Sequence, residues 1–204
     1  MNRITLLIFT LLVGFQSYAI KPTRTYSNIP ELMHLEHETL HIKTEDRASL
    51  NVWHLPSESE GTPVIISQSD AGNMGDWLYL GLYLQAYGLD VWMYDYRGFG
   101  ESDDFAIVRD LLFHLEFVND LDAVAGHVYR KTGKSPALLG ISMGTIIVNE
   151  YLRIADIPVS KVIFDGYVAD PRVWNEKLAD NIAGFFRYPE EYTTAVVEFL
   201  TNNQ

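Results

Sequence analysis

Apolar and polar residues alternate in two short segments near the start of the chain. Leu40 and Ile42 are flanked by polar residues, and the alternation resumes at Leu50 and Val52. The polar stretch 45–47 separates the two segments. Because successive side chains of a strand point to opposite faces, this pattern predicts an antiparallel hairpin with one face in water.

Beyond this hairpin, the pattern changes to short continuous apolar runs that alternate with helical segments. Continuous runs are typical of strands covered on both faces, and apolar residues at steps of three and four are typical of helices. The expected strands are 64–66, 89–94, 137–139 and 159–164, and the expected helices are 77–87, 111–128, 146–155, a segment from 171 onward and a last one from 189 to about 200. Alternation of this kind predicts an α/β fold: a mostly parallel sheet with helices on both faces and an N-terminal antiparallel hairpin.

Composition narrows the class of protein further. The chain has 204 residues, of which 48% are hydrophobic and 13% aromatic, so it is long and apolar enough for one domain with a substantial core. With 15 Lys and Arg against 27 Asp and Glu, its net charge is −12, and no basic run is present. An electrostatic footprint for phosphate backbones is therefore missing, and nucleic acid is not an expected partner. The absence of cysteine excludes disulfides, thiolate metal sites and thiol nucleophiles.

The first 19 residues have the order of a secretory signal peptide. Arg3 precedes the apolar run 4–15, and Ser17 and Ala19 place small residues at both ends of a cleavage triplet. The apolar run is shorter than the roughly 20 residues needed to span hydrocarbon, which favours cleavage over a retained membrane anchor. We therefore expect a signal peptide at 1–19, a domain at 20–204, and an exported protein, periplasmic or extracellular, without a stable membrane anchor.

One pentapeptide carries candidate chemistry. Residues 140–144 read Gly-Ile-Ser-Met-Gly and match G-x-S-x-G between a predicted strand and a predicted helix. In this context the two glycines allow strand and helix to approach closely, and the turn presents Ser142 as a nucleophile. The N–H of Met143, at the start of the following helix, is then a donor for a developing oxyanion.

Two more segments, together with this turn, resemble the α/β-hydrolase fold superfamily. Residues 95–102, Asp-Tyr-Arg-Gly-Phe-Gly-Glu-Ser, look like the D-x-R-G-x-G-x-S loop of that superfamily, and 71–74 look like the end of its H-G-N-A-G-N oxyanion loop. The spacing is also similar, and the resemblance covers roughly 36–170. It is strongest to serine hydrolases of the lysophospholipase-like, monoacylglycerol-lipase-like and depalmitoylase-like types. It implies hydrolysis of a carboxylic ester or thioester through an acyl-serine intermediate, with a small-molecule acyl substrate and no cofactor.

The oxyanion loop departs from the pattern of this superfamily. Its His-Gly falls on Gln68 and Ser69, and Asp70 stands where the second oxyanion donor is expected. The backbone N–H of Asp70 can still serve, whereas its carboxylate repels an oxyanion unless it turns away or is protonated.

The histidine of the triad is also missing from its expected place. In this superfamily the order is serine, acid, histidine, but all six histidines here precede Ser142. Three explanations remain open: a truncated hydrolase lacking strands 7 and 8, a noncatalytic pseudoenzyme, or a displaced base, for which His114 is the best-placed histidine. Truncation fits best, because the strand 159–164 is otherwise left as an exposed edge.

Two carboxylates and one histidine pair complete the candidates. Asp165 ends the predicted sixth strand, where some members of the superfamily carry the triad acid, although Asp-Gly is also a common turn pair. Asp95 and Arg97 are expected to form an ion pair that fixes their loop. His37 and His41 have no third ligand nearby, so no metal site is predicted.

Taken alone, the sequence predicts an exported hydrolase-fold protein with catalytic Ser142 and Asp165, and with oxyanion donors at Met143 and Asp70. The alternative is a noncatalytic binding protein that uses the same apolar cleft, lined by Trp77, Phe99 and Met143. The sequence predicts neither the acyl chain nor the head group of a substrate, and it leaves the oligomeric state open.

Overall fold

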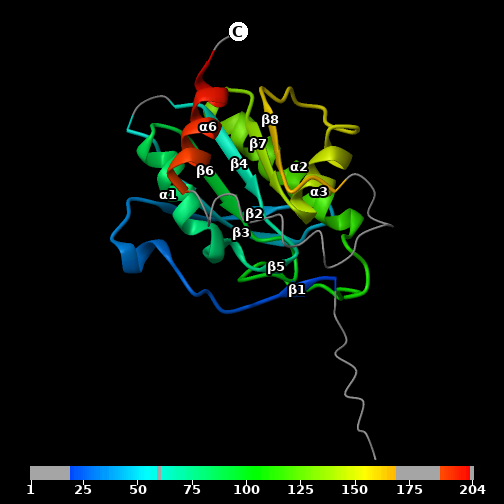
Figure 1. Ribbon diagram of the computed structural model, residues 1–204. Helices are drawn as coiled ribbons and strands as arrows, with labels where there is room; N and C mark the ends of the chain where they lie inside the picture. The colour runs from blue at the N-terminus through cyan, green and yellow to red at the C-terminus, as the bar shows by residue number, and fades with distance from the viewer. Residues whose placement is uncertain (1–18, 59–60, 169–188, 203–204) are drawn as a thin grey trace, which may run out of the picture.

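A six-stranded sheet forms the centre of the computed structural model, which describes residues 19–58, 61–168 and 189–202 (Figure 1). The order of its strands is β2-β3-β6-β4-β7-β8. The strands are β2 Glu38–Lys43, β3 Ser49–Leu55, β4 Pro63–Ser67, β6 Asp90–Tyr94, β7 Ala137–Ile141 and β8 Val162–Asp165.

The pairing of the strands confirms both parts of the predicted sheet. β2 and β3 form the antiparallel hairpin, with Leu40 opposite Val52 and Ile42 opposite Leu50. The predicted face in water is present on β2 only, because β3 is covered on both faces and is buried along most of its length. β6, β4, β7 and β8 run parallel to one another. β4 is buried along its whole length, as the continuous apolar run predicts.

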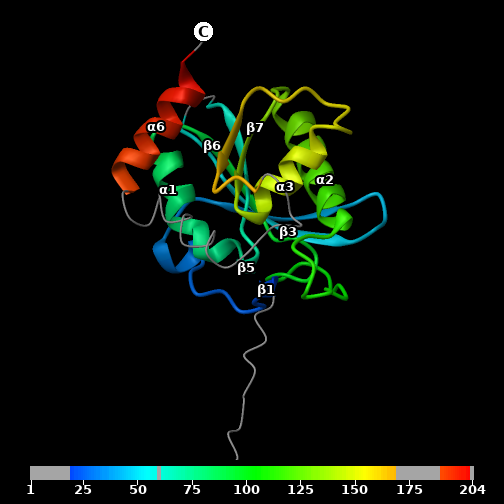
Figure 2. The ribbon, with the colours of Figure 1, turned by 45° about the vertical axis from the view of Figure 1, so that its right-hand side comes forward.

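Helices cover both faces of the sheet (Figure 2). One face packs against α1 Leu78–Ala86 and α6 Pro189–Thr201, and the other against α2 Leu115–Thr132 and α3 Met143–Tyr151. Two apolar cores result: one contains Leu80 of α1 and Val196 of α6, and the other contains Leu121 of α2 and Ile147 of α3. The prediction of an α/β sheet with helices on both faces is confirmed.

Several predicted element boundaries differ from the observed ones; the strand predicted at 159–164, for example, is β8 Val162–Asp165. α2 begins at Leu115, not at Leu111, because residues 111–114 form a loop in which Leu111 is exposed. α2 ends at Thr132 and is capped by Gly133, the predicted stop, where φ of 68° suits glycine. α3 occupies Met143–Tyr151 instead of 146–155, and α1 is preceded by η2 Met74–Trp77, a short 3₁₀ helix.

A second, two-residue parallel ladder joins the N-terminal segment to the loop after β4, at the carboxyl edge of the parallel strands. The hydrophobic pattern does not reveal it. β1 Lys21–Pro22 pairs with β5 Ala71–Gly72, and Lys21 N–H donates to Asp70 O at 2.8 Å. The segment before it is equally fixed, because Ile20 is fully buried and its N–H donates to Arg109 O at 3.1 Å. A further short 3₁₀ helix, η1 Pro30–Met33, follows. This N-terminal segment is therefore part of the fold next to the oxyanion loop.

Two predictions fall outside the described residues. The predicted signal peptide lies there except for Ala19, and so does the start of the helix expected from 171 onward. The last predicted helix is confirmed as α6, which begins at Pro189.

Candidate active site at the turn after β7

Ser142 turns the chain from β7 into α3. Its backbone has φ 51° and ψ −114°, a region that non-glycine residues rarely adopt. Within the described residues only His34 and Arg47 are other non-glycine residues with positive φ. Strain of this kind persists where the surrounding structure enforces it, and it is concentrated at functional sites. Ser142 thus lies between a strand and a helix, β7 and α3, as the sequence predicts.

The two glycines of the turn are required by close packing. A Cβ atom on Gly144 would lie 2.0 Å from the carbonyl oxygen of Ser67, at the end of β4. A Cβ atom on Gly140 would lie 2.8 Å from the carbonyl oxygen of Gly144. Both distances are shorter than real Cβ contacts, so any larger residue forces strand and helix apart.

The hydroxyl of Ser142 faces a carboxylate. Ser142 is fully buried, and its Oγ donates a hydrogen bond to Asp70 Oδ1 at 3.4 Å. Its carbonyl oxygen accepts from the N–H and the hydroxyl of Thr145, at 2.9 and 2.7 Å. These bonds fix the first turn of α3. Met143 is the first residue of this helix, so its N–H belongs to the amides that receive no acceptor from within the helix.

Asp70 combines partial burial with several donors. Burial raises the pKa of its carboxyl group, while its own backbone N–H, the Ser142 hydroxyl and the charge of Lys21 act in the opposite direction. The N–H that sequence reasoning assigned to the oxyanion thus lies against the carboxylate of the same residue. The oxyanion role of Met143 and Asp70 stays a prediction.

Asp165 is next to Ser142 through the backbone. Its carbonyl oxygen accepts the Ser142 N–H at 2.8 Å, as the last step of the β7–β8 ladder. Its side chain meets the phenol of Tyr192 from α6, a residue that sequence reasoning did not single out. Burial raises the pKa of Asp165, which the hydrogen bond from Tyr192 opposes. The acid role of Asp165 stays a prediction, and its partner in this structure is a phenol.

The predicted ion pair between Asp95 and Arg97 is wrong. Asp95 is fully buried and accepts hydrogen bonds from Met74 N–H at 2.8 Å, from Gln68 Nε2 at 3.2 Å and from the Tyr26 hydroxyl. Burial raises its pKa to about 6 against these donors. A Cβ atom on Gly100 would lie 1.9 Å from Asp95 Oδ2, so the glycine makes room for this carboxyl. The group joins the N-terminal segment to the oxyanion loop.

Arg97 instead forms a network with two other carboxylates. Its Nε and Nη2 donate to Asp120 Oδ1 on α2, at 2.9 and 2.7 Å. Its guanidinium also binds Asp46 in the turn between β2 and β3. These hydrogen bonds hold the pKa of Asp46 well below its usual range, whereas burial raises that of Asp120 to about 6. Arg97 therefore links the loop after β6 to the β2–β3 hairpin and to α2.

The contacts of His114 do not support it as a displaced base. Its Nε2 accepts the backbone N–H of Val108 at 3.1 Å, and its ring lies edge-on to Phe105 and Phe117. A neutral imidazole has one acceptor nitrogen and one donor nitrogen. Because the acceptor is already used, His114 has no lone pair left for the proton of Ser142.

The prediction of an apolar cleft lined by Trp77, Phe99 and Met143 is wrong. Phe99 and Met143 are fully buried in the core on the side of α2 and α3, where Phe99 packs against Tyr96 and Phe117. Trp77 is buried in the other core, on the side of α1 and α6. These three side chains therefore do not line one cleft.

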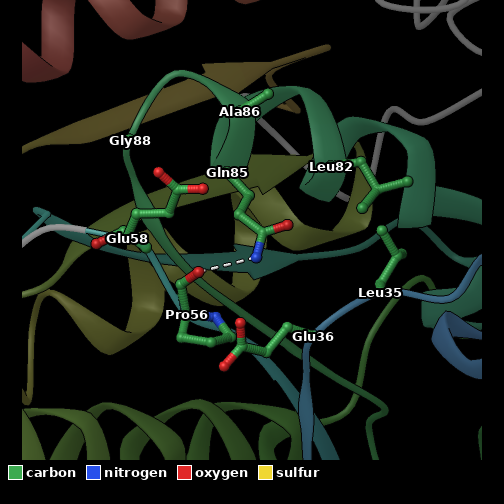
Figure 3. Close-up of a pocket in the computed structure, with 9 residues that line it drawn as sticks. Leu35, Glu36, Pro56, Glu58, Leu82, Gln85, Ala86 and Gly88 are labelled. Atoms are coloured by element: carbon green, nitrogen blue, oxygen red, sulfur yellow. Dashed lines mark hydrogen bonds between the residues drawn. The ribbon is translucent and has the colours of Figure 1, made fainter.

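A separate hollow of about 970 Å³ lies at the opposite edge of the parallel strands (Figure 3). Gln85 Nε2 donates a hydrogen bond across it to Pro56 O at 2.8 Å. The residues that line the hollow are Leu35, Glu36, Pro56, Ser57, Glu58, Leu82, Gln85, Ala86 and Gly88. β6 begins just after Gly88, whereas ligands of open α/β sheets bind beyond the carboxyl ends of strands. The hollow is therefore distinct from the Ser142 turn.

No group of three or more potential metal ligands was found in the part of the chain that the structure describes. His37 faces Glu31 and the carbonyl oxygen of Leu35, at 3.0 and 2.9 Å. His37 is therefore hydrogen-bonded to Glu31 of η1, whereas His41 is exposed on β2.

Comparison with known proteins identifies the same fold. A family model described as alpha/beta hydrolase fold matches residues 62–203. An esterase from Exiguobacterium antarcticum is 27% identical with a TM-score of 0.54, over 65% of this chain and 46% of that one. An esterase from Pyrococcus furiosus is 19% identical with a TM-score of 0.60, over 89% of this chain and 68% of that one.

Two curated relatives are similar in sequence. An uncharacterized membrane protein of Saccharomyces cerevisiae is 25% identical over 160 residues, which are 75% of this chain and 56% of the relative. An uncharacterized protein of Salmonella typhi, YfhR, is 30% identical over 140 residues, which are 65% of this chain and 44% of the relative. The chain thus spans about half the length of the curated relatives it matches.

Proposed function

Because the chain belongs to the alpha/beta hydrolase fold family, we propose that it is a serine hydrolase of carboxylic esters or thioesters. The observation that carries the proposal is the backbone of Ser142, held at φ 51° between β7 and α3. Contacts with the backbone of Ser67 and Gly144 require the two glycines of the turn, as the G-x-S-x-G pattern expects. The similarity to the Exiguobacterium esterase supports an ester as the substrate.

In the proposed reaction the Ser142 oxygen attacks the acyl carbonyl, and the alcohol or thiol leaves from an acyl-Ser142 intermediate that water then hydrolyses. The negative charge of the tetrahedral intermediates develops near the N-terminus of α3, where the Met143 N–H is a donor. Such donors accelerate acyl transfer because they are oriented before the charge forms. Asp165, at the end of β8, is the proposed acid of the catalytic triad.

A noncatalytic binding protein is the second candidate. It is favoured by one observation: Ser142 is fully buried, and its hydroxyl is already bound by a carboxylate. A serine without a positioned base is a poor nucleophile. This candidate predicts a folded protein whose serine does not react with acylating reagents.

Labelling with a fluorophosphonate probe distinguishes the two candidates. We expect the purified mature protein to take up the probe and the Ser142→Ala variant to lose it. Hydrolysis of p-nitrophenyl butyrate is followed in parallel. Ser135→Ala is the matched control, because Ser135 lies in the loop before β7 and not at the turn. Labelling that persists in Ser142→Ala, or a folded wild type that takes no label, contradicts the serine hydrolase.

The proposal includes export to the periplasm or the cell exterior, based on the sequence pattern of residues 1–19. No helix within the described ranges is long and apolar enough to cross a membrane. Expression of the full chain in a Gram-negative bacterium, followed by mass spectrometry of the recovered protein, tests this part. We expect an N-terminus near Ile20 in the periplasmic fraction. Recovery of an unprocessed chain from the cytoplasm contradicts export.

A further inference from the structure

Asp70 is held in a fixed position beside the Ser142 hydroxyl. It follows β4 by three residues and precedes β5, so the β1–β5 ladder holds the backbone on its C-terminal side. Its carbonyl oxygen accepts the Lys21 N–H at 2.8 Å. Its Oδ1 accepts the Ser142 Oγ–H at 3.4 Å. This hydrogen bond is long, as catalytic hydrogen bonds often are before a substrate binds.

Other candidate bases are engaged elsewhere. In the described part of the chain, Asp70 is the side chain that hydrogen-bonds Ser142 Oγ. His114 uses its acceptor nitrogen for Val108 N–H, and the Asp165 carboxyl group meets the Tyr192 phenol. The geometry therefore places one carboxylate in the position that a general base must occupy relative to a serine nucleophile.

The surroundings of Asp70 make it more basic than an exposed aspartate. Partial burial disfavours the charged form and raises the pKa of the carboxyl group. Lys21 and the Ser142 hydroxyl oppose this effect but do not reverse it. A carboxylate with a raised pKa accepts a proton more readily than an exposed one.

We propose that Asp70 is the general base that activates Ser142. This inference rests on the proposed serine hydrolase function. As Ser142 Oγ forms its bond to the acyl carbon, the hydroxyl proton moves to Asp70 Oδ1, and the carbonyl electrons move onto the oxygen. When the tetrahedral intermediate collapses, the bond to the alcohol or thiol breaks, and the neutral acid returns the proton to that leaving group. In the second half, water attacks the acyl carbon as it gives a proton to the same carboxylate. The bond between Ser142 Oγ and the acyl carbon then breaks, Asp70 returns the proton to Ser142 Oγ, and the carboxylic acid leaves.

This role also removes the electrostatic conflict expected from the sequence. A carboxylate beside a developing oxyanion is repulsive only while it carries its charge. Proton transfer from Ser142 neutralises Asp70 in the step in which the oxyanion forms.

The Asp70→Asn variant tests the inference, because an amide has similar shape and cannot accept the proton. We expect the kcat for p-nitrophenyl butyrate and the rate of fluorophosphonate labelling to fall by about 10²- to 10⁴-fold, with KM changed only a few-fold. The p-nitrophenolate leaving group needs no proton, so the loss reports the activation of Ser142. Asp104→Asn is the matched control, since the side chain of Asp104 is almost fully exposed.

The pH profile of the wild type gives a second measurement that needs no variant. We expect kcat/KM to rise with pH through a midpoint above the ordinary aspartate value of about 3.9 and then to level off, and Asp70→Asn to lack this limb. An unchanged or faster Asp70→Asn, or a wild-type rate that increases as the pH falls, overturns the general base while Ser142 labelling still supports the hydrolase. A folded wild type that takes no label overturns both.

Discussion

At the scale of single residues, the turn at Ser142 depends on glycines whose role is steric. Gly144 lies against the backbone of Ser67, so a methyl group there meets an atom that cannot rotate away. Gly126 on α2 is a useful contrast. A Cβ atom there would approach only the guanidinium end of Arg130, at 3.1 Å, which is flexible.

We therefore expect Gly144→Ala to destabilise the protein and Gly126→Ala not to. Gly144→Ala should lower the free energy of unfolding by about 1–3 kcal/mol, because it overpacks the contact between β4 and α3. Gly126→Ala should leave it unchanged or raise it by up to about 1 kcal/mol, because alanine favours the helix. Urea denaturation of both variants measures the difference. A Gly144→Ala variant as stable as the wild type would show that strand and helix do not need this close approach.

Residue pairs that are close in the sequence were not a reliable guide to partners. Asp95 and Arg97 were expected to bind each other, yet Arg97 reaches Asp46 and Asp120, and Asp95 receives donors from the N-terminal segment and the oxyanion loop. These partners are distant in the sequence and carry no local signal. The turn itself was predictable, because G-x-S-x-G depends on local backbone geometry.

At the scale of elements, periodicity predicted the strands and helices of the sheet because each has a long enough apolar pattern. The hairpin β2–β3, the buried strand β4 and the helix α6 were all recognisable. The β1–β5 ladder was not, since two residues on each side, one of them Pro22, provide no pattern. The contact between Asp165 and Tyr192 was hidden for a similar reason: it depends on how α6 packs.

Lys161 caps the C-terminal end of α6. Lys161, immediately before β8, donates from Nζ to the carbonyl oxygens of Phe199, Leu200 and Asn202, at 2.7, 3.0 and 2.7 Å. These are carbonyls at the C-terminus of the helix, where a positive charge is favourable. The same helix carries Tyr192, so this cap also positions the partner of Asp165.

Lys161→Met should therefore loosen α6 without unfolding the sheet. We expect faster amide hydrogen exchange in 189–201, equivalent to a loss of about 1 kcal/mol in local stability, and little change in β4. Lys43→Met, at the exposed end of β2, is the control. Equal protection of α6 in Lys161→Met and wild type would show that apolar packing of Val196 and Leu200 alone holds the helix.

At the scale of the whole molecule, buried carboxyl groups and net charge act in the same direction. The chain carries a net charge of −12, and repulsion among its acidic groups grows as they ionise. Asp95 adds a specific contribution: burial raises its pKa to about 6, above the value of about 3.9 expected in the unfolded chain. Between these two values the folded protein binds the proton more tightly than the unfolded chain.

Stability should therefore fall as the pH rises from about 4 to about 6, because the folded state holds the proton of Asp95 that the unfolded state has already lost. For this residue the loss is on the order of 2–3 kcal/mol, given about 1.4 kcal/mol for each pKa unit. Urea denaturation at pH 4.5 and pH 6.5 measures it. Asp95→Asn removes the titration, so its stability should change less over the same interval, and the residual change belongs to the other acidic groups. An equal pH dependence in variant and wild type would mean that Asp95 stays ionised in the folded protein, with Tyr26, Gln68 and Met74 N–H offsetting the cost of burying its charge.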